Sequence, residues 1–315
     1  MKNKELDLVK KIRGRAAEAR RGPPPLLGIG DDAAVLAPWP RDRELLITTD
    51  LAIEGVHFDR TIHPARALGH KVLARGISDI AAMGGEPQYA LLSLCLPHWA
   101  AENWQKQFLE GLFSLAGRHG VRIIGGDLAA GDRLAADITV LGWTPRGRRL
   151  ERGKAKTGDI IYVSGYLGGS ALGLDRLRAG ASPAAAAPRR HLYPSPRVAL
   201  GRFLAGRLGA RAAMDLSDGL SLDLYRLTRE SRVGAEIHAA RIPVFPGATL
   251  DQALHGGEDY ELLFTLDPAR TPPAAYQGLA LTAIGLITRT PSLTLVGSDG
   301  RRRKLPVRGF QHRIQ

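Results

Sequence analysis

Aspartate residues recur in this chain where apolar segments come to an end. Each of these segments stops at or beside glycine, serine or threonine, and one or two aspartates lie at that point, in residues 28–32, 47–50, 77–79, 123–127 and 214–219. Alternating apolar helices and strands with polar ends are typical of an α/β fold. Because the formal net charge is +13, a general excess of acid does not explain these carboxylates. They indicate binding of divalent cations that carry nucleotide phosphates.

The order of apolar patterns predicts an α/β (α+β) protein of two domains. A chain of 315 residues is long for one hydrophobic core and suits two. In the first half we expect a mixed sheet with helices, built from helices at 6–19, 64–83 and 100–119 and strands at 44–49, 88–96, 121–124 and 136–143. A basic, glycine-containing stretch at 145–158 is typical of a connection, so the predicted domains are residues 1–147 and 148–315.

The second domain is predicted to have its own α/β pattern. We expect helices at 168–177, 194–208 and 220–232 and strands at 159–164, 212–215, 235–239, 260–266, 279–287 and 293–296. Residues 180–190 are rich in alanine and proline and are predicted to form a loop.

Composition argues against several classes of protein. No apolar run approaches the ~20 residues that cross a membrane, and the first residues do not resemble a signal peptide, so we expect a cytoplasmic protein without membrane contact. The single cysteine, Cys95, lies in an apolar run and is expected to be a buried structural thiol. The short basic clusters at 146–152 and 301–304 contain no aromatic residues for base stacking, which favours a solvated surface over a nucleic-acid partner.

Three motifs in the first half could bind metal or phosphate. Residues 28–34 combine flexible glycines with adjacent carboxylates, although an ordinary polar turn has the same composition. Residues 48–50 offer two hydroxyls and a carboxylate at a strand end, where such residues also act as simple caps. Asp79 lies among apolar residues of a predicted helix, so it is expected to be partly buried and to need either a metal ion or a salt-bridge partner.

Further candidates lie at strand ends in both halves. Asp127 follows two glycines after a strand, which suits a nucleotide-binding turn. Asp215, Ser217 and Asp218 lie where a strand gives way to a helix, whose N-terminal end attracts phosphate. Asp218 could equally be an N-cap without chemistry. His57 could bind an anion or be structural.

Several familiar active sites are absent from the sequence. It contains no Gly-x4-Gly-Lys-[Ser/Thr] phosphate loop, no Gly-x-Ser-x-Gly nucleophile motif, no Cys-x-x-Cys pair and no zinc-protease motif. Taken together, the acidic motifs predict a site where several Mg²⁺ ions hold a nucleotide and neutralise charge during phosphoryl transfer. No residue is predicted to act as a covalent nucleophile.

In their order along the chain, these motifs resemble those of the thiamine-monophosphate kinase family. That family belongs to a superfamily with aminoimidazole ribonucleotide synthetase, selenophosphate synthetase and a hydrogenase maturation protein. The resemblance runs from about residue 6 to 310 and includes the motifs at 55–58, 78–84, 158–165, 194–197 and 257–262. His57 and the run Gly-Gly-Glu-Asp-Tyr-Glu-Leu point to the kinase rather than its relatives. The chain departs from the family at Gly76, usually asparagine, at Leu128, usually threonine, and at Phe310, usually tryptophan or tyrosine.

The resemblance implies phosphorylation of thiamine monophosphate by ATP with Mg²⁺, giving thiamine diphosphate and ADP, the last step of thiamine diphosphate biosynthesis. It implies Mg²⁺ ligands at Asp32, Thr48, Thr49, Asp50, Asp79, Asp127, Asp215 and Asp218. It implies nucleotide contacts at Gly126, Asp127, Arg152 and Ser217, and thiamine monophosphate contacts at His57, Glu258 and Phe310. It also implies a homodimer whose N-terminal domains pair their sheets, so that residues 1–147 form an ATP- and Mg²⁺-binding and dimerisation domain.

Two alternatives remain open at this point. A relative in the same superfamily could use ATP on another acceptor, such as an aminoimidazole-type or selenium substrate. Selenium chemistry requires a reactive N-terminal cysteine or selenocysteine, which Cys95 in a predicted strand does not match. A basic RNA-binding protein could have kept the fold without catalysis, but retention of every acidic motif argues against it.

Overall fold

The computed structural model describes residues 4–18, 21–29 and 33–311. The chain forms two compact units, Met1–Ile80 with Gly85–Gly147, and Ala81–Gly84 with Arg148–Gln315. We call them unit 1 and unit 2 and describe each by itself. The change of unit in the sequence falls after Gly147, except that four residues of the first half belong to unit 2. The binding and dimerisation roles expected of the N-terminal domain stay predictions.

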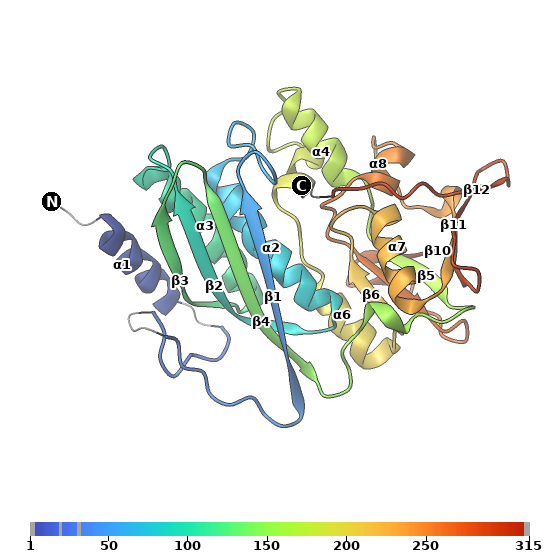
Figure 1. Ribbon diagram of the computed structural model, residues 1–315, viewed down its shortest axis with the longest axis horizontal. Coiled ribbons are helices and arrows are strands. Elements are labelled where there is room, and N and C mark those ends of the chain that lie inside the picture. Colours follow the sequence, from blue (N-terminus) through green and yellow to red (C-terminus); the bar gives the residue numbers. More distant parts are fainter. Residues whose placement is uncertain (1–3, 19–20, 30–32, 312–315) are drawn as a thin grey trace. The chain divides into compact units, whose positions relative to one another are not determined.

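Unit 1 contains a four-stranded mixed sheet in the order β1-β4-β2-β3 (Figure 1). Its strands are β1 (Arg43–Ile53), β2 (Glu86–Leu96), β3 (Arg122–Ala130) and β4 (Ala135–Pro145). β4 pairs antiparallel with β1 and β2, and β2 pairs parallel with β3. The mixed sheet expected from the sequence is therefore confirmed.

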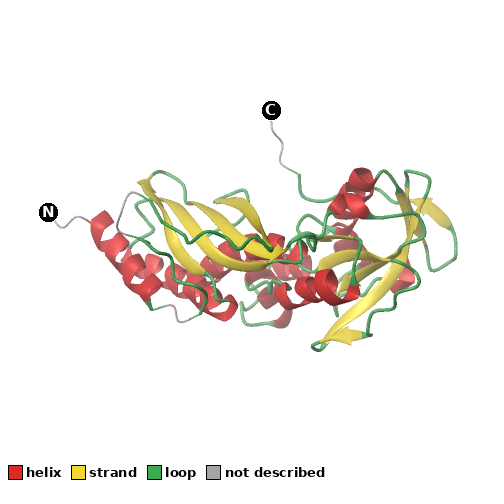
Figure 2. Cartoon of the chain, turned by 90° about the horizontal axis from the view of Figure 1, so that it is seen from below, coloured by secondary structure: helices red, strands yellow, loops and turns green. Residues whose placement is uncertain are grey.

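Three helices accompany this sheet: α1 (Lys4–Ala17), α2 (Ala65–Ala82) and α3 (Glu102–His119). They lie on one face, and no helix formed by the described residues of unit 1 covers the other face (Figure 2). Side chains alternate along a strand, so Leu46, Thr48, Asp50 and Ala52 of β1 point toward the helices. Leu45, Ile47, Thr49 and Leu51 point to the opposite side, which we call the open face.

Two glycines let α2 and α3 approach closely. A Cβ atom on Gly69 of α2 would lie 1.9 Å from the carbonyl oxygen of Phe108, and one on Gly111 of α3 would lie 1.8 Å from that of Arg66. No real side chain fits such a distance, so backbone packs against backbone at this crossing. The contact brings the buried faces of both helices onto the sheet.

Unit 2 contains an eight-stranded sheet in the order β12-β11-β7-β10-β5-β8-β6, with β9 paired to β10. Its strands are β5 (Ile160–Ser164), β6 (Ala212–Asp215), β7 (Gly234–His238), β8 (Leu262–Leu266), β9 (Ala275–Tyr276), β10 (Leu279–Thr288), β11 (Leu293–Val296) and β12 (Arg302–Lys304). Its α-helices are α4 (Gly169–Arg178), α5 (Ala186–Leu192), α6 (Val198–Phe203), α7 (Leu220–Ser231) and α8 (Leu250–His255). Short helical turns are η1 (Arg152–Lys154), η2 (Leu204–Leu208) and η3 (Ala239–Arg241).

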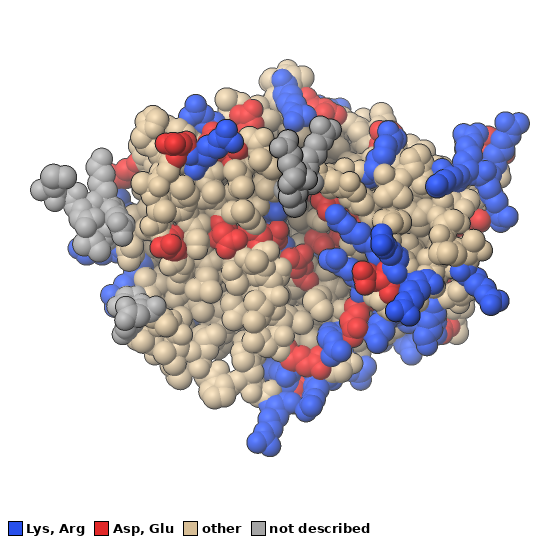
Figure 3. Space-filling model, in the orientation of Figure 1, with Lys and Arg blue, Asp and Glu red and all other residues tan. Residues whose placement is uncertain are grey.

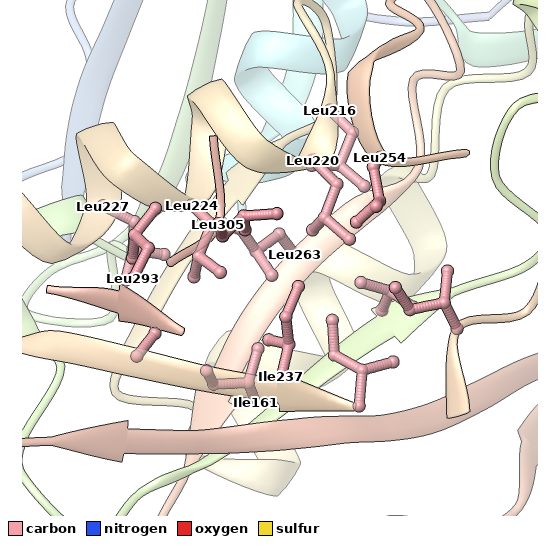
Figure 4. Close-up of a cluster of buried hydrophobic side chains, with 14 of the residues drawn as sticks. Ile161, Leu216, Leu220, Leu224, Leu227, Ile237, Leu254, Leu263, Leu293 and Leu305 are labelled. Carbon is pink, nitrogen blue, oxygen red and sulfur yellow. The ribbon is translucent and has the colours of Figure 1, made fainter. Parts of the chain in front are cut away.

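Two hydrophobic clusters lie on opposite faces of this sheet. Ile161 and Leu263 belong to the cluster under α7, where Leu220, Leu224 and Leu227 point toward the strands (Figure 4). The cluster on the other face contains Leu262, Phe264 and Leu266 of β8 together with Leu200 and Leu204. Unit 2 is therefore a sheet with a core on each side, as expected for an α/β domain.

The sequence prediction was wrong in the segment 180–190, missed several short elements and ended two strands too early. β1 continues to Ile53 and β3 to Ala130, so residues 48–50 and Asp127 lie inside strands, not at a strand end or in a turn as expected. Part of the expected loop is helix α5, which tolerates Pro188 because the proline lies in the first turn, where a backbone N–H needs no helical acceptor. Helix α8 was missed, although Thr249 and Gln252 form a capping box at its start. The short strands β9 and β12 were also missed. Cys95, expected to be buried, is half-buried.

Among the described residues, none of the helices combines the length and the apolar character required to span a bilayer.

We predict that Gly69→Ala lowers the free energy of unfolding by about 2 kcal/mol or more, because the added methyl group forces α2 away from α3. Gly117→Ala is the control on α3, where an added Cβ meets nothing within 4 Å. It should leave stability unchanged or raise it by up to about 1 kcal/mol. Chemical denaturation of both variants tests this, and equal stabilities would contradict the close helix crossing.

Candidate active site

Four side chains meet on the helix-covered face of unit 1, and we call them the β1–α2 cluster. Thr48 and Asp50 come from β1, and Arg75 and Asp79 come from α2. The Thr48 hydroxyl donates to Asp79 Oδ2 at 2.5 Å, and Arg75 Nη2 donates to Asp50 Oδ1 at 2.9 Å. Arg75 Nη1 also donates to the carbonyl oxygen of Leu51 at 3.3 Å. Asp79 is half-buried, as the sequence predicted, and its burial is offset here by a hydroxyl donor.

A second polar group lies on the open face of the same sheet. The Thr49 hydroxyl lies 3.1 Å from Asp137 Oδ1 and 3.0 Å from the Thr139 hydroxyl. Asp127 on β3 and Asp137 on β4 are both in register with Ser93 on β2, so all three side chains share this face. Two strand spacings place the Cα atoms of Asp127 and Asp137 about 10 Å apart. Figure 3 shows a band of acidic side chains across the strands of unit 1.

Strand alternation therefore divides the residues that were expected to act as one ligand set. Thr48 and Asp50 point to the helices, whereas Thr49 points to the open face. Asp137 was missed. Alternation within the predicted strand 136–143 assigns its side chain to one face, but only the pairing of β4 with β1 places it beside Thr49. Arg75 was also missed, although it lies four residues before Asp79 on one helix and therefore on the same helical face.

The glycine before Asp127 is required by its surroundings. Gly126 has φ 144°, and a Cβ atom there would lie 1.8 Å from the carbonyl oxygen of Leu92 on β2. No L-side chain fits, so β3 can approach β2 only with glycine at this position. The Asp127 carboxylate accepts a hydrogen bond from the Leu128 amide at 2.9 Å.

Gly76, where the family usually has asparagine, faces Val140 of β4. An added Cβ atom would lie 2.6 Å from a methyl group of this valine. The glycine therefore leaves room for the side chain of Val140.

The surroundings of Asp50 in the β1–α2 cluster disfavour its ionised form. Burial raises the pKa of Asp50 to about 6, while Arg75 opposes the shift and the charges of Asp79 and Asp137 add to it. This cluster, as defined, contains two carboxylates and only one arginine. Mg²⁺ prefers carboxylate and hydroxyl oxygens as ligands, so the cluster fits this ion. Among the residues that the structure describes, no three or more His, Cys, Asp or Glu side chains already converge on a metal position. Asp32, one predicted ligand, lies outside the described residues.

In unit 2 the loop between β6 and α7 holds the second group of predicted ligands. Asp215 ends β6 and is buried. The amides of Asp218 and Gly219 donate to Asp223 Oδ2 at 3.0 and 3.1 Å. Arg226 Nη1 pairs with Asp218 and lies 3.0 Å from Asp223 Oδ1. We call Asp218, Asp223 and Arg226 the β6–α7 cluster.

Asp223 organises this loop from a buried position. Its side chain is fully buried, and burial raises its pKa to about 6, with the charge of Asp218 adding to the shift and two backbone hydrogen bonds and Arg226 opposing it. The sequence interpretation of Asp218 as a possible N-cap missed this arrangement, in which Asp223 satisfies the loop amides. Asp223 and Arg226, three residues apart on α7, share one helical face.

A second loop, residues 257–261, lies along the first. The Glu258 amide donates to the Ser217 carbonyl oxygen at 2.7 Å, and the Tyr260 amide donates to that of Leu216 at 2.9 Å. Glu258 and Tyr260 have left-handed backbones, with φ 65° and 50°. Such conformations cost energy in non-glycine residues and persist only where the surroundings impose them.

Buried ionic contacts impose this conformation. Glu261 is fully buried and accepts hydrogen bonds from the Ser164 hydroxyl at 2.5 Å, from Arg190 at 2.8 Å and from Arg197 Nε at 2.8 Å. Asp259 accepts hydrogen bonds from the amides of Gly168, at 2.6 Å, and Ser170, at 3.0 Å, at the start of α4. Burial raises the pKa of Asp259 to about 7, against the effect of these hydrogen bonds. The loop is therefore anchored by two buried carboxylates, Asp259 and Glu261.

The remaining predicted residues can now be placed. Phe310 joins the β6–α7 loop, because its amide donates to the Asp218 carbonyl oxygen at 3.1 Å, and its side chain is 42% exposed. His57 lies in the turn after β1, where its Nδ1 accepts from the Ile53 amide at 3.1 Å. Arg152 lies in η1, and its carbonyl oxygen accepts from the Ser231 hydroxyl.

The structure thus brings together two sets of predicted residues. Unit 1 assembles Thr48, Asp50 and Asp79 on one face of its sheet and Thr49 and Asp127 on the other. Unit 2 assembles Asp215, Ser217, Asp218, Glu258 and Phe310. Each set combines hard oxygen ligands with backbone amides or glycines, which is the chemistry of a phosphate- and metal-binding enzyme.

Comparisons with known proteins show the family to which the chain belongs. Residues 30–144 match the family described as AIR synthase related protein, N-terminal domain. The thiamine-monophosphate kinase of Escherichia coli K12 is 40% identical over 303 residues, covering 91% of each chain. The crystal structure of thiamine-monophosphate kinase from Stenotrophomonas maltophilia K279a has a TM-score of 0.81 and 37% identity, covering 93% of this chain and 96% of that chain.

A further solved structure contains ligands. AaThiL complexed with AMPPCP and TMP has a TM-score of 0.78 and 31% identity and covers 99% of both chains. Residues 30–144 thus match an AIR synthase related N-terminal domain, and the two-unit fold is shared with solved thiamine-monophosphate kinase structures. The chain belongs to the thiamine-monophosphate kinase family and is a kinase.

We predict that Asp50→Asn stabilises the protein in magnesium-free buffer at pH 8. The folded-state pKa of Asp50, about 6, exceeds the ordinary 3.8, so ionisation of this carboxyl costs folding free energy that begins to appear above pH ~4 and is complete above pH ~6. The variant should gain up to ~3 kcal/mol at pH 8 and nothing near pH 3.5. Urea denaturation at both pH values measures the difference, and a constant difference would contradict it.

Proposed function

We propose that this protein transfers the γ-phosphoryl group of ATP to thiamine monophosphate, giving thiamine diphosphate and ADP, in the last step of thiamine diphosphate biosynthesis. Relatives named thiamine-monophosphate kinase cover nine-tenths of the chain, and a similar structure holds AMPPCP and TMP. The observation that carries the proposal is the pairing of the loops at 215–219 and 257–261 through the Glu258–Ser217 hydrogen bond. It joins a predicted nucleotide contact to a predicted contact of the acceptor.

The proposed roles follow the two groups of residues. We assign Mg²⁺ ligation to Asp32, Thr48, Thr49, Asp50, Asp79, Asp127, Asp215 and Asp218. We assign nucleotide contacts to Gly126, Asp127, Arg152 and Ser217, and thiamine monophosphate contacts to His57, Glu258 and Phe310. Asp137, which shares the open face with Asp127, joins the acidic residues as an additional candidate. The exposed ring of Phe310 is suited to stacking on an aromatic ring of the acceptor.

The proposed chemistry needs positioning and charge rather than a covalent intermediate. The acceptor is already a phosphate oxygen, so no strong general base and no protein nucleophile are required. Magnesium, when bound, would neutralise charge that develops on the transferred phosphoryl group. The protein's part is to hold carboxylates close together and to keep the 215–219 loop in one conformation.

We propose that the protein works as a homodimer joined through the sheet of unit 1. Leu45, Ile47 and Leu51 on the open face of β1 are 42%, 62% and 47% exposed. The same face carries a broad area without charged side chains (Figure 3). Apolar area of this kind is typical of a protein interface, and a second copy of this sheet is the partner that the family resemblance implies. A cytoplasmic location is part of the same proposal.

Magnesium-dependent formation of thiamine diphosphate from ATP and thiamine monophosphate tests the function, with free thiamine as the parallel acceptor. We expect product from the monophosphate only. In the same assay Asp50→Asn and Asp127→Asn should each lower kcat by about 100-fold or more, because each removes the charge of a carboxylate that we assign to Mg²⁺. Circular dichroism should show both variants folded. Near-normal turnover in both would defeat the proposed metal ligands, and no product from wild type would indicate another acceptor.

The dimer proposal predicts that Ile47→Asp gives monomers in sedimentation-velocity experiments. A buried carboxylate without a partner at the interface costs several kcal/mol of association free energy. Leu250→Asp is the control, since Leu250 of α8 in unit 2 is also an exposed apolar side chain. The control should remain dimeric. An Ile47→Asp dimer as tight as wild type would place the interface elsewhere.

A further inference from the structure

Each acidic cluster contains one arginine from a helix that packs beside it. In the β1–α2 cluster, Arg75 Nη2 lies 2.9 Å from Asp50 Oδ1, and the two side chains are 16% and 24% exposed. Arg75 lies four residues before Asp79 on α2, so the helix supplies both an acid of the cluster and the arginine that pairs with Asp50. The second hydrogen bond of Arg75, to the Leu51 carbonyl oxygen, fixes the guanidinium against β1.

The β6–α7 cluster repeats this arrangement in unit 2. Arg226 pairs with Asp218 and with Asp223, which lies three residues earlier on the same helix. Asp223 is fully buried and Asp218 is 22% exposed. The two clusters come from different units and different elements, so the arrangement arises twice in the chain.

An arginine in such a place acts as a permanent local cation. The guanidinium stays charged at every working pH, and its planar donors match a carboxylate. Partly buried acids repel one another unless a cation lies between them. Arg75 and Arg226 therefore stabilise Asp50 and Asp218 in the metal-free protein, and each occupies a carboxylate that the proposed function assigns to a metal ion.

We propose that Arg75 and Arg226 are positioning residues, built-in counter-ions that hold Asp50 and Asp218 in place and that a divalent cation must displace in order to bind. The inference rests on the proposed metal roles of these two aspartates. It follows that Mg²⁺ without nucleotide binds weakly, because the ion competes with a guanidinium that is already paired with the carboxylate. Mg²⁺ that arrives with a nucleotide brings phosphate oxygens, which offer the displaced guanidinium a new partner.

The test is Mg²⁺ binding to the full chain without nucleotide or thiamine monophosphate, followed by isothermal titration calorimetry. Arg75→Gln should bind Mg²⁺ at least about tenfold more tightly than wild type, since it removes one competing unit charge at close range. Its melting temperature without metal should fall, and its rise on addition of Mg²⁺ should exceed that of wild type. Arg226→Gln should behave in the same way.

Two variants serve as controls. Arg75→Lys keeps the charge and should keep the weak Mg²⁺ binding of wild type. Arg66→Gln makes the same chemical change on the same helix at an exposed position and should change neither the affinity nor the melting temperature. If Arg75→Gln fails to fold, Arg226→Gln and Arg75→Lys still decide the question.

The outcomes separate this inference from the proposed function. Unchanged or weaker Mg²⁺ binding by both glutamine variants would overturn the counter-ion role, whatever wild type does with thiamine monophosphate. Tighter binding in these variants, with no thiamine diphosphate formed by wild type, would support the counter-ions and reject the proposed reaction.

Discussion

Carboxylates that lie close together and partly out of water must be neutralised, and this requirement shapes both clusters. Burial, and to a smaller extent the charge of neighbouring acids, raises the pKa values of Asp50 and Asp223 and thereby the cost of ionising them. The chain meets the cost with hydroxyl donors, backbone amides and one guanidinium per cluster. What remains is a deficit of positive charge, which is the physical basis for proposing that metal ions complete the site.

The four-stranded sheet gives this chemistry two separate surfaces. Alternation along β1 turns Asp50 toward Arg75 and Asp79 on the helix-covered face and turns Thr49 toward Asp137 on the open face. The close crossing with α3 at Gly69 and Gly111 holds α2, the helix that carries both Arg75 and Asp79, against its neighbour. The apolar part of the open face is then available for the proposed contact between two copies.

In unit 2, buried carboxylates hold the loop at residues 257–261 in place. Glu261 accepts hydrogen bonds from Ser164, Arg190 and Arg197, and Asp259 accepts them from the first amides of α4. These anchors hold the two left-handed residues beside them in this loop, Glu258 and Tyr260. The neighbouring loop is bound to it through Ser217 and Leu216. Loss of either carboxylate would therefore change the conformation of both loops.

The sequence by itself determined most of the longer helices and strands, the mixed sheet, the acidic motifs and the family, because periodicity and motif order are local properties of the chain. It also predicted that Asp79 is partly buried. Only the tertiary structure decided which acids are neighbours. Strand register placed Asp137 beside Thr49, 88 positions away, helix packing set Arg75 against Asp50, and α7 turned Asp223 and Arg226 to the preceding loop. It also showed α5 where a loop was expected. These contacts depend on register and packing between distant segments, to which single-sequence patterns carry no direct signal.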